Sequence, residues 1–77
     1  MLKMTKEERD HQIAFAERQF EIYKMRVLYN QSLASQSMVA GLKTTAENHL
    51  ARTHRFIVLM EETNEFIDKM RRMETTK

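Results

Sequence analysis

The sequence predicts an all-α fold, an antiparallel hairpin of two helices (about 6–40 and 45–73) that dimerises into a four-helix bundle. The 77 residues contain no proline and a single glycine, Gly41, whereas a sheet protein needs turn-forming residues every few positions. Apolar residues recur at spacings of three and four on both sides of Gly41, as in packed helices. A chain this short gains only about 3–5 kcal/mol from its own core. It has no cysteine for a disulfide, so we expect one helical-hairpin domain, residues 1–77, that self-associates.

The expected first helix begins with a capping box. In Thr5-Lys-Glu-Glu8 the Thr5 hydroxyl can accept a hydrogen bond from the Glu8 amide, while the Glu8 carboxylate accepts one from the Thr5 amide. Periodic apolar residues then continue to Gly41, which suits the left-handed residue that closes a helix. The serine- and amide-rich stretch 30–37 has low helix propensity. A kink or break near Asn30, giving three helices, is therefore the alternative.

Two apolar faces are expected on the first helix. One has the spacing of a packing seam and comprises Ile13, Ala16, Phe20, Tyr23, Val27, Ala34 and Met38. The other lies more than a quarter-turn away and comprises Phe15, Ile22, Tyr29 and Leu33, with Met25 beside it. One hairpin partner covers one seam, so the second face predicts a second neighbour.

The expected second helix starts at another capping box, from Thr44 to Glu47, and presents one broad apolar arc. This arc comprises Phe56, Leu59, Met60, Thr63, Phe66, Ile67 and Met70, with Ile57 and Asn64 at its edge. Val58 points instead toward the charged opposite side. An arc this wide suits a helix that touches two others. The predicted dimer interface comprises Phe15, Ile22, Met25, Tyr29, Leu33, Phe56, Met60 and Ile67.

No pattern in the chain predicts catalysis, a cofactor or a bound metal. Two helical residues that bind one metal need a spacing of three or four, and His49 and His54 are five apart. His11 has a suitable spacing from Glu7, but both lie in the expected first turns of a helix, where such residues are ordinarily solvated. The segment from Glu47 to His49 does not supply the Glu-x-x-His pair of a di-iron bundle. With no glycine-rich phosphate loop and no nucleophile spaced from a base, an enzyme is not expected.

Charge and targeting signals narrow the classes of partner. The net charge of +2 is too small to predict a nucleic-acid partner by itself. The longest apolar run, five residues from Phe56, is far below the ~20 needed to span a bilayer, and the N-terminal segment lacks the apolar core of a signal peptide. We therefore expect a cytoplasmic protein without membrane insertion. Its length and initial Met are typical of small bacterial or phage proteins.

The most informative polar feature lies near the expected hairpin loop. His49, Arg52 and Arg55 advance by three and take the angular range that apolar residues hold further along, so the buried arc is expected to turn basic there. Fraying is one explanation, because bundle ends meet water and long arginine side chains reach solvent. The functional interpretation is a recognition surface for an acidic partner or a phosphate. Val58 is the other candidate for contact with a partner, a lone exposed valine being the alternative.

Three functions are compatible with these patterns. The favoured one is a small non-enzymatic protein-binding module, a homodimer that acts on a larger protein as a regulator, inhibitor or assembly adaptor. The partner-binding residues predicted for it are His49, Arg52, Arg55 and Val58. The second is a nucleic-acid-binding dimer, against which the interspersed acidic residues count; it would use Arg52, Arg55, Lys24 and Arg26. The third is a purely structural subunit of a larger helical assembly.

Overall fold

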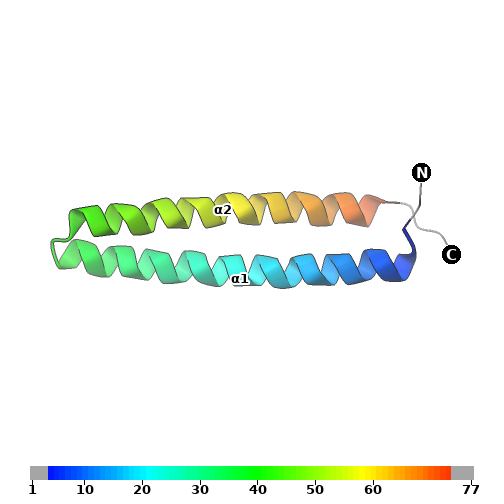
Figure 1. Cartoon of the computed structure of the whole chain (residues 1–77), viewed down its shortest axis with the longest axis horizontal. Coiled ribbons are helices and arrows are strands. Elements are labelled where there is room, and N and C mark those ends of the chain that lie inside the picture. The colour runs from blue at the N-terminus through cyan, green and yellow to red at the C-terminus, as the bar shows by residue number, and fades with distance from the viewer. Residues whose placement is uncertain (1–3, 74–77) are drawn as a thin grey trace.

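The computed structural model describes residues 4–73, which form two long helices, α1 (Lys6–Val39) and α2 (Lys43–Arg72). The helices run antiparallel and side by side, with their loop at one end of the hairpin and the start of α1 and the end of α2 at the other, which we name the free end (Figure 1). The hairpin is a narrow rod that measures 59 × 17 × 14 Å. The prediction of an all-α helical hairpin is confirmed, and each helix boundary lies within two residues of the expected one.

α1 begins at its predicted cap and continues unbroken to Val39. The Glu8 N–H donates to Thr5 Oγ1 at 3.1 Å, which is half of the capping box, while the reciprocal bond to the Glu8 carboxylate is not formed. The alternative of a break near Asn30 is wrong. Asn30 is buried, and its Nδ2 donates to the Arg26 carbonyl at 2.8 Å. The amide is thus satisfied on the preceding helical turn without interrupting the helix.

Gly41 closes α1 as expected, through a Schellman motif. Its φ is 78°, in the left-handed region that glycine enters without steric cost. The Leu42 N–H donates to the Ser37 carbonyl at 2.8 Å, and the Gly41 N–H donates to the Met38 carbonyl at 3.1 Å. These two bonds define the motif and satisfy carbonyls at the end of the helix.

α2 begins at Lys43, two residues before the predicted start. Leu42, the last residue of the Schellman motif, is also the N-cap of α2, and no side chain caps this helix. Thr44 lies inside the first turn, so the predicted capping box from Thr44 to Glu47 is wrong. The turn itself reverses the chain so tightly that it leaves no room for a separate cap segment.

A heptad seam joins the two helices. In a heptad lettered a to g, positions a and d face the partner helix. On α1 these positions are Arg9, Ile13, Ala16, Phe20, Tyr23, Val27, Asn30, Ala34 and Ser37. On α2 they are Ala46, His49, Thr53, Phe56, Met60, Thr63, Ile67 and Met70. All of these residues are buried or half-buried, so the alternation of three and four is unbroken along the described length of both helices. Met38, predicted for this seam, lies outside it and is 59% exposed.

The seam changes character along the rod. Toward the free end it buries large apolar side chains, including Ile67 and Met70, and near the middle the rings of Tyr23 and Phe56 lie 6.1 Å apart. Toward the loop it buries small or polar residues, namely Asn30, Ala34, Ser37, Ala46 and Thr53. Burial of apolar area is the main stabilising term in a core. The loop half therefore gains less stability from apolar burial than the free half, and its small side chains let the two helices approach closely.

Candidate protein-interaction surface

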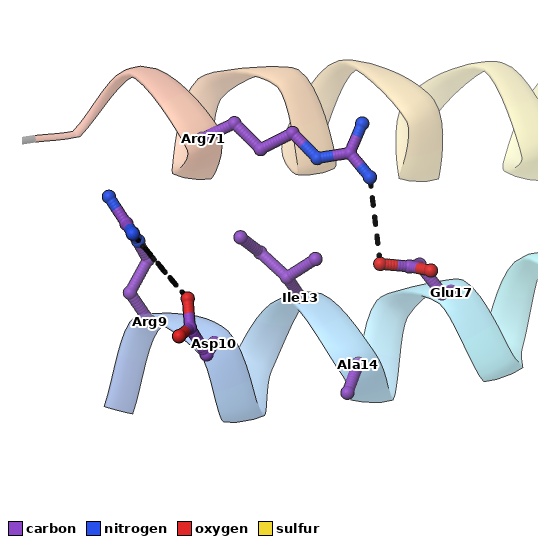
Figure 2. Close-up of a pocket in the computed structure, with 6 residues that line it drawn as sticks. All are labelled: Arg9, Asp10, Ile13, Ala14, Glu17 and Arg71. Carbon is purple, nitrogen blue, oxygen red and sulfur yellow. Dashed lines mark hydrogen bonds and ion pairs between the residues drawn. The ribbon is translucent and has the colours of Figure 1, made fainter. Parts of the chain in front are cut away.

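Two different sides flank the seam. Glu17 and Arg71 both occupy position e, and the Arg71 Nη2 lies 3.6 Å from Glu17 Oε1 across the two helices (Figure 2). Because this ion pair joins the e positions of both helices, their g positions lie together on the opposite side of the hairpin. We name these two surfaces the e side and the g side.

The g side carries a line of apolar residues, which we name the apolar flank. Its members are Phe15, Ile22, Tyr29 and Leu33 of α1 and Leu59, Phe66 and Met73 of α2. Phe15 is 54% exposed, Tyr29 61% and Phe66 41%. A spacing of seven residues recurs on both helices, as it does along a packed helix face. Rows of large, exposed apolar side chains are a candidate site of interaction.

The structure divides the predicted dimer interface between this flank and the seam. The predicted residues of α1 lie on or beside the flank, where they are exposed or half-buried; they are Phe15, Ile22, Met25, Tyr29 and Leu33. The predicted residues of α2 lie on the seam and face α1; they are Phe56, Met60 and Ile67. Ile67 is only 5% exposed. The outward row of α2 consists instead of Leu59, Phe66 and Met73.

The sequence predicts Leu59 and Phe66 inside the buried arc and does not place Met73 in it. Assigning α2 to a heptad register separates its seam residues from its outward row. Starting at Ala46, the alternation of three and four reaches Met70 without passing through Leu59 or Phe66. The heptad register is hard to recognise in the sequence, because Ala46 and Thr53, which set it near the loop, are not strongly apolar.

The predicted partner-binding residues do not form one surface. Arg52 and Arg55 are exposed, one turn apart, on the g side of α2, where they continue from the loop-side end of the apolar flank. Val58 is exposed on the outer face of α2. His49 faces the seam, half-buried, and its Nδ1 is buried without a hydrogen-bond partner. The expectation that the buried arc turns basic near the loop is wrong for Arg52 and Arg55, which lie outside the seam; of the three predicted residues only His49 faces it.

A second and smaller apolar surface lies on the e side near the loop. We name it the loop-side group; it comprises Leu28, Met38, Leu50 and Ile57, all exposed. Further toward the free end the e side is polar, with Glu17, Asn64 and Arg71. The two apolar surfaces therefore lie on opposite sides of the hairpin.

The free end holds a shallow recess whose charges are already paired (Figure 2). The Arg9 Nη1 donates to the Met73 carbonyl at 3.2 Å, and the Arg9 Nε lies 3.5 Å from Asp10 Oδ1. Arg71 pairs with Glu17 across the recess. Arg9 thus satisfies a carbonyl at the end of α2, where a cation is favourable. These contacts tie the two helix ends together and explain the recess as a structural feature.

Charge is distributed unevenly along the rod. From residue 22 to residue 60 the chain has five basic residues and one acidic residue, Glu47. In the described part of the other half, residues 4–21 and 61–73, nine acidic residues outnumber six basic ones. On the g side of the loop half the charged residues at positions c and g are Arg26, Arg52 and Arg55, with no carboxylate among them. The loop half is therefore basic and the free half acidic.

The fold and these surfaces define an antiparallel helical hairpin with an uncovered apolar flank. Within residues 4–73 no cluster of three or more His, Asp or Glu side chains could hold a metal ion. Neither helix, over the same residues, is long and apolar enough to cross a membrane. Comparison with protein-family models, curated proteins and solved structures gave no match. The functional argument therefore rests on the surface itself.

Proposed function

We propose that the chain is a non-enzymatic protein-binding module that forms a homodimer, a four-helix bundle, through its apolar flank. It then acts on a larger protein as a regulator, inhibitor or assembly adaptor. One observation supports this most strongly, namely that Phe15, Ile22 and Tyr29 follow each other at intervals of seven while remaining about half exposed. Fully burying a large apolar side chain is worth roughly 1.5–3 kcal/mol. Several such residues together offset a large part of the cost of association.

The dimensions of the rod suit this dimer. A lengthwise contact over a face 59 Å long and 14 Å wide covers on the order of 800 Å² per partner, the size of a standard stable interface. A second copy supplies the same apolar flank, so the interface is self-complementary, as a two-fold dimer requires. The bundle places a third and a fourth helix against the side that a single hairpin leaves in water.

The loop-side group is the surface that we propose for the larger protein. Leu28, Leu50 and Ile57 lie on the e side, away from the apolar flank, so they stay accessible in the dimer. Val58, on the outer face of α2, extends this surface. Exposed apolar residues that gather on one side of a protein are candidates for a protein–protein interaction site.

Nucleic-acid binding is the second candidate function, and the basic loop half is the observation that favours it. Arg26, Arg52 and Arg55 share the g side, whereas Lys24 lies at position e on the opposite side. The predicted basic set is thus divided between two sides, which weakens the case for a continuous phosphate-binding stripe. Capture experiments with and without nuclease separate the two functions, because a nucleic-acid partner is lost on digestion and a protein partner is retained.

The test of the proposed dimer is a matched pair of double variants. Ile22→Lys with Tyr29→Lys places two charges on the apolar flank, and Leu28→Lys with Leu50→Lys places two charges on the loop-side group at similar exposure. Light scattering at micromolar concentration should show a dimer for the wild type and the second variant, and a monomer for the first. Circular dichroism reports whether each variant stays helical.

A second measurement covers the case in which the flank variant unfolds. The midpoint of thermal unfolding of the wild type should rise with protein concentration, because folding is then linked to association. A monomeric wild type with a concentration-independent midpoint contradicts the proposal. Dissociation by the loop-side variant alone would assign the interface to the e side instead.

A further inference from the structure

We infer that the second copy lies antiparallel on the apolar flank, with the loop of each hairpin beside the free end of the other. The inference rests on the proposed self-association and adds its orientation. Both orientations bury most of the apolar flank, whose residues run from Phe15 to Leu33 on α1 and from Leu59 to Met73 on α2. Burial of apolar surface therefore does not choose between them, and the charges do.

A parallel dimer would bring like charges together. It would place Arg26, Arg52 and Arg55 of one copy beside the same three arginines of the other, with no carboxylate on that part of the g side. Like charges next to each other at an interface are unfavourable, and more so where apolar contact excludes water. These arginines would oppose the parallel arrangement in the part of the loop half nearest the middle of the rod.

An antiparallel dimer removes this repulsion. The arginines of one copy then lie along the free half of the other, whose g side carries Glu8, Glu62 and Lys69 at position c and whose described residues have more acidic than basic side chains. The two-fold axis passes through the middle of the rod, perpendicular to it, and both basic halves meet acidic halves at once. Charge complementarity of this kind fixes orientation more than it adds affinity.

This orientation gives Arg52 and Arg55 a definite role. They would contact the second copy beside the apolar flank rather than an outside protein. His49, which faces the seam, contributes to neither surface. The loop-side group and Val58 remain the surface for an outside partner, one at each end of the dimer.

Pulsed electron paramagnetic resonance on singly labelled full-length chains tests the orientation directly. The sequence has no cysteine, so Lys43→Cys and Arg72→Cys each introduce one site for a nitroxide label. Lys43 starts α2 at the loop and Arg72 ends it at the free end, and both are exposed. Circular dichroism checks that both labelled chains remain helical, and light scattering on the same samples gives their oligomeric state.

The antiparallel dimer predicts opposite results for two samples. Lys43-labelled chains alone should give a long distance, close to the 59 Å length of the rod. Lys43-labelled and Arg72-labelled chains, mixed in denaturant and refolded together, should add a short distance set by the width of the bundle. A short distance in the first sample overturns the orientation while leaving the proposed dimer intact. A monomer by light scattering overturns both.

Discussion

Replacing Gly41 by alanine should destabilise the hairpin by about 1 kcal/mol, entirely through the backbone. Gly41 has a φ of +78°, and a Cβ built on it meets no atom within 4 Å, so no steric clash contributes. Holding an L-residue in the left-handed region lowers the free energy of unfolding by roughly 1–2 kcal/mol. Against this, alanine lowers the entropy of the unfolded chain and returns about 0.4–1 kcal/mol. The difference between the two terms leaves a net loss of about 1 kcal/mol.

Two further substitutions at Gly41 separate backbone strain from lack of space. Gly41→Asn should cost less than alanine, because asparagine tolerates the left-handed conformation better. D-alanine, introduced by chemical synthesis, prefers positive φ and should stabilise the hairpin by about 0.4–1 kcal/mol. Urea unfolding followed by circular dichroism at one protein concentration measures all three differences. Equal losses for L- and D-alanine would show that crowding, and not φ, makes glycine necessary.

Three other tests, with five substitutions, address particular contacts by the same unfolding measurement. Thr5→Ala should cost about 1 kcal/mol because it removes the cap of α1, whereas Thr44→Ala should be close to neutral because no side chain caps α2; similar losses would mean that Thr44 is a cap. Met70→Ala should cost about 2–5 kcal/mol and Met38→Ala much less, because Met70 is 3% exposed and Met38 59%; the reverse order would refute the seam. His49→Leu should raise stability by about 1 kcal/mol, since it removes a buried nitrogen without a partner, and a loss would mean that His49 is hydrogen-bonded.

The helix ends were predictable because their causes are local. Thr5 caps α1 by accepting a hydrogen bond from the amide three residues later, and Gly41 adopts its left-handed conformation within a single turn of chain. Neither depends on which residues the partner helix presents. The second cap, at Thr44, failed for a reason of the same short range. The Schellman motif makes Leu42 the N-cap of α2. Thr44, two residues later, already lies inside the helix and cannot be its N-cap.

The assignment of residues to seam or surface was less predictable, because it depends on the partner helix. When α2 is considered alone, its apolar arc includes both Phe56 and Phe66, and nothing in the pattern shows which of them faces α1 and which lies on the apolar flank. The observed seam follows Ala46 and Thr53, which packing selects for small size rather than for hydrophobicity. A seam of small residues lets two helices approach closely, and only the paired structure shows that Arg52 lies outside it.

Under the proposed antiparallel arrangement, the two loops of a dimer lie at opposite ends of one rod. Val39 and Leu42 are exposed at each loop, Val39 by 90%, and the loop-side group lies on the same half of each hairpin. A partner bound at one end could not reach the other across a rod 59 Å long, so the dimer would hold two partners independently and could bridge them. A parallel bundle would instead place both loops at the same end, with the two loop-side groups on opposite faces of that end, because each e side points away from the interface. The distance between two bound partners, close to the length of the rod or close to its width, therefore reports the orientation of the bundle independently of labels on the chain itself.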